Sequence, residues 1–341
     1  MKDAKKKLVV HIGFPKTATS TIQLNLLSEL YREGHIEYLN HLGRPDPNFG
    51  EITCAKTIKY ITHQTDDIDY KEELEPIADS EKSIAVISNE HLSFFEKDFS
   101  WANLGYEGYL NLDRIYEVFD GIFDSIEILI GIRSQTSLIS SFYAETYHFI
   151  IQHGKYLGLF ENWFKKNFTD VTSINKLPFN YYVMAKHASS LFGKDNVHLA
   201  VFEDLKQKKQ GYYDAIASIF RVSGDYIKEI LQHNSKNVTI KYPDGYVSAN
   251  HPPLGVYLTA PFRGALRKIS DTSSYLLLRK MYHTLLPSKI RNQKVAKEKK
   301  IRVPSEEEER QIMKLFNSSN LALIEDFNLN SEEMRRHKYI L

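Results

Sequence analysis

Residues 8–23 read LVVHIGFPKTATSTIQ, and this stretch joins a buried strand to a helix through a polar loop. The apolar run Leu8–Ile12 predicts the strand, and the apolar spacing that follows residue 21 predicts the helix. The start of a helix offers unpaired N–H groups and a partial positive charge, which favour an anion such as phosphate. A cap alone would not need one lysine and four hydroxyl groups in so short a loop. The stretch therefore predicts an anion site made by Lys16, Thr17, Ala18, Thr19, Ser20 and Thr21.

Three further apolar runs also lack a polar alternation, namely Ile84–Ser88, Ile126–Ile132 and Val197–Phe202. Strands that are buried on both faces of a parallel sheet have this character. Helical spacing of apolar residues lies between the runs, over residues 22–31 with a C-cap at Gly34 and again over residues 138–150. Strands that alternate with helices predict a doubly wound, mainly parallel α/β sheet, whose ligands bind beyond the carboxyl ends of the strands.

Composition excludes several classes of protein but names no function. The 341 residues include 44 Lys or Arg and 43 Asp or Glu, so the net charge of +1 lacks the basic excess of a nucleic-acid binder. Cys54 is the single cysteine, which excludes an internal disulfide and a cysteine-based zinc cluster. The apolar stretch near the N-terminus is too short for a signal peptide, and no run of 18 apolar residues occurs. We therefore expect a cytoplasmic protein without an ordinary membrane span.

Two segments depart from this charge balance. Residues 66–81 hold eight acids against one base, a pattern more typical of a solvated face than of an interaction site. Residues 263–302 hold twelve Lys or Arg against two acids, and we interpret them as part of a variable helical subdomain with a solvated basic face. The alternative for this basic segment is peripheral contact with the anionic inner face of a membrane, or with an anionic acceptor. Beyond it, Ser305 and four glutamates predict the start of a last helix.

The order of residues in the loop after Leu8–Ile12 separates two kinds of phosphate site. A Walker A loop needs Gly-Lys-Ser/Thr, which does not occur here. Lys16 instead precedes the small residue, in Pro-Lys-Thr-Ala-Thr-Ser, and this order closely resembles the 5′-phosphosulfate loop of sulfotransferases that use 3′-phosphoadenylyl sulfate (PAPS). That family commonly has Pro-Lys-Ser/Thr-Gly-Thr-Ser/Thr. Ala18 replaces the usual glycine and should narrow the loop slightly.

A second element of the resemblance follows the run Ile126–Ile132. The family binds the 3′-phosphate of PAPS with an arginine at the end of a strand and a serine eight residues later, which correspond to Arg133 and Ser141. A guanidinium can hold two phosphate oxygens and the serine a third. The resemblance implies that PAPS is the sulfuryl donor, that it leaves as 3′,5′-bisphosphoadenosine, and that no metal is required. The glutamine that follows this arginine and Ser134, Gln135, resembles the sequence of the bacterial and carbohydrate-type branch of the family.

Weaker similarities extend over most of residues 8–240 and 305–330. Glu203-Asp204-Leu205 resembles a family strand that ends in Glu-Asp-Leu, which we interpret as a structural turn, and residues 315–327 resemble a closing helix. The resemblance implies one sulfotransferase domain over residues 1–341 with a P-loop NTPase-like core. The basic helical insert, at about residues 250–303, has no counterpart that we can place.

The chemistry implied by the resemblance needs a charge stabiliser and a general base. Sulfuryl transfer is an in-line displacement, and Lys16 is our candidate for stabilising the 5′-phosphate that leaves. The run Ile84–Ser88 is followed by Asn89-Glu90-His91, in which Glu90 is the first candidate for the base and His91 the second. Glu90 could also be a helix-start residue or an ion-pair partner. We expect His11, inside a buried strand, to be a core histidine.

Three functions are consistent with these residues. The first is a sulfotransferase that acts on a hydroxyl or amine of an acceptor, expected to be a saccharide or glycolipid. The second is a P-loop-type kinase for a nucleotide or small molecule, which the missing Gly-Lys-Ser/Thr disfavours. The third is a non-catalytic nucleotide-binding protein on the same scaffold, against which the presence of Lys16, Arg133 and Ser141 argues.

Overall fold

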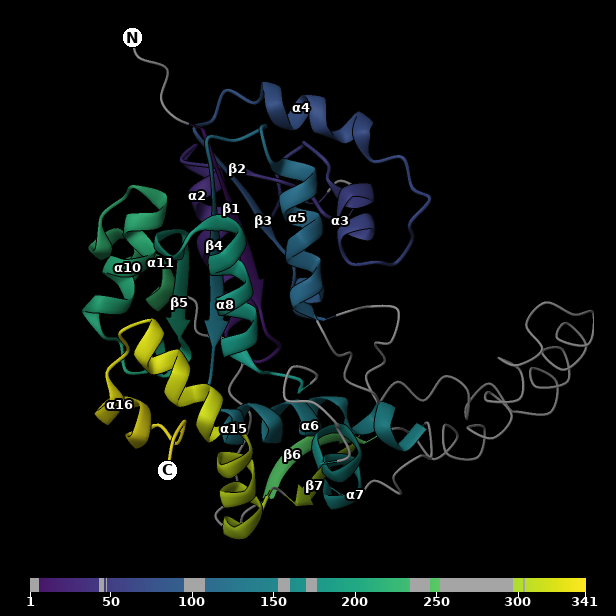
Figure 1. Ribbon diagram of the computed structural model, residues 1–341, viewed down its shortest axis with the longest axis vertical. Helices are drawn as coiled ribbons and strands as arrows, with labels where there is room; N and C mark the ends of the chain where they lie inside the picture. The colour runs from purple at the N-terminus through teal and green to yellow at the C-terminus, as the bar shows by residue number, and fades with distance from the viewer. Residues whose placement is uncertain are drawn as a thin grey trace, which may run out of the picture.

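A five-stranded parallel sheet lies at the centre of the computed structural model, with the strand order β2-β3-β1-β4-β5 (Figure 1). The structure describes residues 6–42, 46, 48–94, 108–152, 160–169, 177–233, 246–251, 297–302 and 304–341. The strands are β1 Lys7–Gly13, β2 Glu37–Tyr38, β3 Ile84–Ser88, β4 Ser125–Ile132 and β5 Val197–Val201. Each of the four apolar runs forms one of these strands, so the predicted doubly wound α/β class is confirmed. The sequence did not predict β2, because two residues are too short to form a run.

Side chains of the central strands alternate between two hydrophobic cores, one on each face of the sheet. Leu8, Val10 and Ile12 of β1 belong to one core, whereas Val9 belongs to the other. The period of two follows from the pleat of a strand. Both sets are apolar because helices cover both faces, and this explains why the run Leu8–Ile12 shows no polar alternation.

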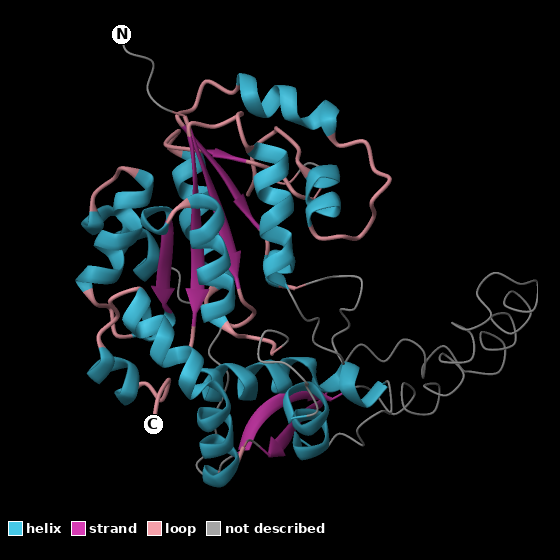
Figure 2. Cartoon of the chain, in the orientation of Figure 1, coloured by secondary structure: helices cyan, strands magenta, loops and turns pink. Residues whose placement is uncertain are grey.

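The helices form a layer on each face and a further group beyond the carboxyl ends of the strands (Figures 1 and 2). The first core includes residues from α3 Ala55–Ile61, α4 Leu74–Asp79, α5 Asn111–Phe119 and α8 Tyr181–Phe192. The second includes residues from the continuous helix α1 Thr19–Thr21, η1 Ile22–Leu27 and α2 Ser28–Arg32, and from α10 Gln210–Phe220 and α11 Gly224–His233. The helix α6 Gln135–Gln152 passes beyond the ends of the strands (Figure 2). The other helical segments are η2 Lys71–Glu73, η3 Glu90–Ser93, η4 Gly108–Leu110, α7 Phe160–Phe164, η5 Lys165–Thr169, η7 Lys194–Asn196, α9 Phe202–Lys206, α15 Glu306–Asp326 and α16 Ser331–Arg336.

Both predicted helices are present. Gly34 follows Arg32 with φ +77°, the left-handed conformation that a C-terminal glycine supplies, and the apolar residues of 138–150 lie within α6. In the described part of the chain, none of the helices combines the length and apolar character that crossing a bilayer would take.

Two glycines at the carboxyl ends of β1 and β4 make room for the loop after β1. Gly13 and Gly131 face each other in the register of the two strands. A Cβ on Gly13 would lie 2.3 Å from Oγ1 of Thr19, and one on Gly131 would lie 2.8 Å from Oγ1 of Thr17. Such contacts are too close for real side chains, so these glycines let both threonines pack directly against the sheet.

The C-terminal helices close the core next to α6. Ser305 caps α15 in a capping box, in which its Oγ accepts from the N–H of Glu308 at 3.3 Å, as predicted. Asn320 of α15 and Gln135 of α6 exchange two buried amide hydrogen bonds, at 3.0 and 3.1 Å. These reciprocal bonds fix the start of α6 relative to α15.

The two described ends of the basic insert are strands rather than helices. β6 Tyr246–His251 pairs antiparallel with β7 Lys297–Arg302, from Tyr246↔Arg302 to His251↔Lys297. Residues 252–296 and 303 lie outside the described residues, and with them most of the basic segment 263–302. The helical character predicted for the insert therefore stays a prediction for most of its length, and its described end at residues 297–302 is a strand.

The acids of the segment 66–81 are solvated except for one. Seven of its acids are exposed, whereas Glu73 is 6% exposed. The Glu73 carboxylate accepts from the N–H groups of Lys56 and Thr57 and from the hydroxyl of Thr57. It therefore caps the start of α3, a role that the charge pattern alone did not indicate.

Candidate functional site

The candidate site lies where the chain leaves β1 and β4. These strands are adjacent and parallel. Their connections lead toward opposite edges of the sheet, because β1 continues to β2 at one edge and β4 continues to β5 at the other. Such a switch point opens a crevice beyond the carboxyl ends of the two strands. Lys16 follows β1 and Arg133 follows β4, so the two predicted cations come from the two sides of this crevice.

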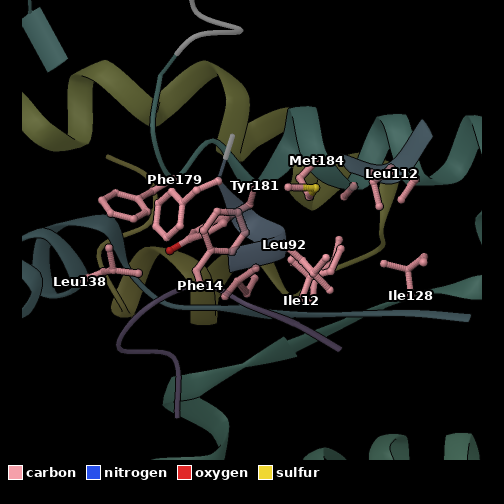
Figure 3. Packing of buried hydrophobic residues seen from close by; sticks show 14 of the residues in the cluster. Ile12, Phe14, Leu92, Leu112, Ile128, Leu138, Phe179, Tyr181 and Met184 are labelled. Carbon is pink, nitrogen blue, oxygen red and sulfur yellow. The ribbon is translucent and has the colours of Figure 1, made fainter. Parts of the chain in front are cut away.

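The loop after β1 turns back on the carbonyl oxygen of Phe14. The hydroxyls of Thr17 and Thr19 donate to this oxygen at 2.6 and 3.2 Å, and both residues are buried. Phe14 itself packs edge-on against Phe179 and Tyr181, as Figure 3 shows. Two of the four predicted hydroxyls therefore hold the loop in place, while Ser20 is exposed and Thr21 is partly exposed.

Two residues of this loop have left-handed backbone conformations. Lys16 has φ +68° and Ala18 has φ +69°, which are unusual for residues other than glycine. Alternation of this kind can point successive N–H groups into one concavity that suits an anion. Ala18 therefore carries backbone strain that a glycine would not have, beyond the narrowing of the loop expected from its Cβ.

The helix that begins at Thr19 has no side-chain cap. Its N-cap residue is Ala18, which has no side-chain acceptor, and the structure gives no side-chain cap hydrogen bond at this helix start. The N–H groups of a first helical turn have no partner within the helix. In the described structure this helix start thus presents backbone donors next to Lys16, the arrangement that binds phosphate in other proteins.

Arg133 joins the two sides of the crevice. Its Nη1 donates to the carbonyl oxygen of Lys16 at 2.9 Å, and its Nε donates to Oγ of Ser137 at 2.9 Å. The guanidinium carbon lies 4.6 Å from the centroid of the Phe202 ring. Burial lowers the pKa of Arg133 and the charge of Glu203 opposes this, but a guanidinium remains charged in proteins.

The predicted structural turn at Glu203 supports the position of Arg133. Its carboxylate accepts from the N–H of Ser134 at 3.1 Å and from the hydroxyl of Tyr339 at 2.9 Å. The hydroxyl of Tyr181 donates to the carbonyl oxygen of Arg133 at 2.7 Å. Side chains from α8, α9 and the C-terminal segment thus fix the backbone next to the guanidinium.

One face of α6 connects the two cations. Ser137 contacts Arg133, and Glu145 lies 3.4 Å from the Nζ of Lys16. Ser141 falls between them, one turn from each, because residues four apart share a helix face. In the described structure Ser137 accepts a hydrogen bond from Arg133, while the role of Ser141 as a phosphate ligand stays a prediction. The sequence analysis missed Ser137 and Glu145, although spacing by four from Ser141 could have identified both.

The two candidates for the base follow β3. Glu90 begins η3 and is partly buried. Burial raises the pKa of Glu90, as does the charge of Glu145, whereas His91, Lys16 and a hydrogen bond from Thr19 lower it. The side chain of Asn89 accepts from the N–H of His91 at 2.8 Å and caps η3. The structure therefore brings Glu90 close to Lys16 and Thr19 of the anion loop.

Two other histidines lie near these residues. His11 is buried, its Nδ1 lies 2.6 Å from Oγ of Ser88, and burial lowers its pKa to about 4, as expected of a neutral core histidine. Burial and then the charge of His91 lower the pKa of His41 to about 4. His41 is a neighbour of the site that the sequence analysis missed.

Within the described residues, no three His, Cys, Asp or Glu side chains are arranged to hold a metal ion.

Comparison with known proteins leaves the family open. No protein-family model matches the sequence, and no curated protein matches it. Among solved structures, a sulfotransferase from Alicyclobacillus acidocaldarius overlaps 78% of this chain and 97% of its own, at 15% sequence identity and a TM-score of 0.38. An overlap this loose does not establish a shared family, so the function has to be inferred from the site itself.

The strain at Ala18 can be measured. Because the left-handed conformation costs an L-residue roughly 1–2 kcal/mol, Ala18→Gly should leave the free energy of unfolding unchanged or raise it by up to about 1 kcal/mol. Ala215→Gly is the matched control, since Ala215 is exposed inside α10 and should lose about 1 kcal/mol. Urea denaturation measures both, and an equal loss in the two variants would contradict the strained conformation.

Proposed function

We propose that this protein transfers a sulfuryl group from PAPS to a hydroxyl or amine of an acceptor. The observation that carries the proposal is the hydrogen bond of 2.9 Å between Arg133 Nη1 and the carbonyl oxygen of Lys16. It joins a lysine loop at an uncapped helix start to a guanidinium on the neighbouring strand. Two cationic points on one crevice suit a nucleotide that carries phosphates at both the 3′ and the 5′ position of its ribose.

The residues around the crevice have the chemistry that such a ligand needs. Lys16 and the N–H groups at the start of α1 would hold the 5′-phosphosulfate. Arg133 and the hydroxyls of Ser137 and Ser141 would hold the 3′-phosphate, since Nη1 and Nε use only part of the donor capacity of the guanidinium. PAPS, when bound, supplies the activated sulfuryl group.

The chain itself supplies charge stabilisation and proton transfer. Lys16 would stabilise the negative charge that develops on the 5′-phosphate as the bond to sulfur breaks. Glu90 would accept the proton that the acceptor hydroxyl or amine loses as it bonds to sulfur. A raised pKa makes this carboxylate a stronger base than an ordinary glutamate.

The acceptor class rests on the resemblance alone. Gln135 matches the carbohydrate-type branch, so a saccharide or glycolipid hydroxyl is the proposed acceptor. In the described structure the side chain of Gln135 donates a hydrogen bond to Asn320. This contact gives Gln135 a structural role in addition to the family branch that it resembles. We propose a cytoplasmic location. Binding of anionic lipid by the segment 263–302 would place the protein at the inner face of a membrane.

Titration with 3′,5′-bisphosphoadenosine tests the donor site. We expect micromolar binding by calorimetry, weakened about 10- to 100-fold in Lys16→Ala and in Arg133→Ala, because a hydrogen bond to a charged group contributes roughly 1.5–3 kcal/mol. Lys59→Ala on the exposed face of α3 is the matched control and should bind like the wild type.

Either of two results would contradict the donor assignment. One is equal affinity in the wild type and both site variants. The other is failure to bind the bisphosphate together with tight, magnesium-dependent binding of ATP, which would favour the kinase alternative.

The base can be identified from the pH dependence of turnover. Glu90→Gln should lower kcat by roughly 100- to 10,000-fold, while His91→Ala should keep most activity. A carboxylate accepts a proton only above its pKa, so kcat/KM of the wild type should fall as the pH falls through the raised pKa of Glu90. The acid limb should therefore lie above the usual value for glutamate. Near-normal turnover in Glu90→Gln would exclude this residue as the base.

A further inference from the structure

The ammonium group of Lys16, which is the candidate phosphate ligand, forms an ion pair with a carboxylate of this chain. Its Nζ lies 3.4 Å from Oε1 of Glu145, with side-chain exposures of 27% and 51%. The carbonyl oxygen of Lys16 is held separately by Arg133. The ammonium group can therefore change partners while the backbone that carries it stays fixed.

The charges around Glu90 depend on which partner Lys16 has. Within the described residues, the groups whose charge or hydrogen bond acts on Glu90 are Glu145 from α6, Lys16 and Thr19 from the anion loop and helix start, and His91 beside it on η3. In the Lys16–Glu145 pair, the ammonium offsets the negative charge of Glu145. When Lys16 turns to an anionic ligand, this offset is lost, and Glu90 faces a full second carboxylate.

We propose that Glu145 competes with the donor phosphates for Lys16 and thereby links donor binding to the protonation of Glu90. This inference rests on the proposed function, because it gives Glu145 a role at the same site. Glu145 is a positioning residue in this account, since it acts through Lys16 and Glu90 and does not touch the reacting atoms. Donor binding then raises the proton affinity of Glu90, which makes it a stronger base at the time when an acceptor can react. By thermodynamic linkage, protonation of Glu90 must in turn favour donor binding.

The size of the effect follows from the exposure of the pair. Half-exposed ion pairs contribute little, so removing Glu145 should tighten donor-site binding by about two- to fivefold, which corresponds to roughly 0.4–1 kcal/mol. The proton balance provides a second signal. Near the pKa of Glu90, the wild type should take up more protons on binding than a variant without the Glu145 charge. In the wild type Glu145 holds the Lys16 ammonium near Glu90, so donor binding withdraws more positive charge from Glu90 than it does in the variant.

Calorimetric titration with 3′,5′-bisphosphoadenosine in two buffers of different ionisation enthalpy measures both quantities. Glu145→Gln should bind about two- to fivefold more tightly than the wild type and take up fewer protons. Glu161→Gln on the exposed face of α7 is the matched control and should behave like the wild type in both respects. The protons of the ligand phosphates are common to all the proteins, so the difference between proteins is the readout.

A double-mutant cycle tests whether the effect passes through Lys16. In the Lys16→Ala background, Glu145→Gln should give no gain in affinity. An equal gain in both backgrounds would show that Glu145 only repels the ligand and would overturn the proposal. Unchanged affinity and proton uptake in Glu145→Gln would overturn it as well, while leaving the donor site intact. Failure of the wild type to bind the bisphosphate would overturn the proposed function and this inference together.

Discussion

The hydrogen bond from the guanidinium of Arg133 to the carbonyl oxygen of Lys16 is the constraint on which the rest of the candidate site depends. It ties the loop after β1 to the end of β4, the two sides of the crevice. The loop can approach so closely because Gly13 and Gly131 have no Cβ to collide with Thr19 and Thr17. The same bond leaves other guanidinium N–H groups for a ligand, and it does not engage the lysine ammonium, whose partner in the structure is Glu145.

The surroundings of this bond show why Arg133 keeps one position. Phe202 covers one face of the guanidinium, Ser137 accepts from its Nε, and Glu203 supplies a compensating charge behind it. Glu203 is in turn held by Tyr339 from the C-terminal segment, which follows α16. Residues almost the whole length of the chain apart therefore fix one cation. A planar group with several donors is useful in a binding site only if its direction is set in advance.

The sequence predicted those parts of the molecule that follow from local patterns. The four long strands, the helix after the anion loop, its end at Gly34 and the helix start at Ser305 each follow from period, composition or turn chemistry within a few residues. Lys16, Arg133, Glu90 and His91 were placed at strand ends in the same way, and the parallel sheet brings those ends together.

What the sequence did not predict depends on contacts between distant segments. Glu145 is an ordinary glutamate in a helical pattern, and only the passage of α6 beyond the strand ends brings it to Lys16. Ser137 is an ordinary serine in the same helical pattern, and only the position of the Arg133 side chain shows that it accepts a hydrogen bond from the guanidinium. β2 is too short to leave a pattern, and Glu73 caps a helix that begins 18 residues before it.

The central claim is that the loop after β1 and the end of β4 hold one bisphosphate ligand together. Hydrogen–deuterium exchange with and without 3′,5′-bisphosphoadenosine tests it most directly, because it reports each segment separately. The account predicts that amide protection increases in residues 14–22 and in residues 133–141 at the same ligand concentration, and that Arg133→Ala weakens protection in both. Protection confined to one of these segments, or found in neither at saturating ligand, would contradict it.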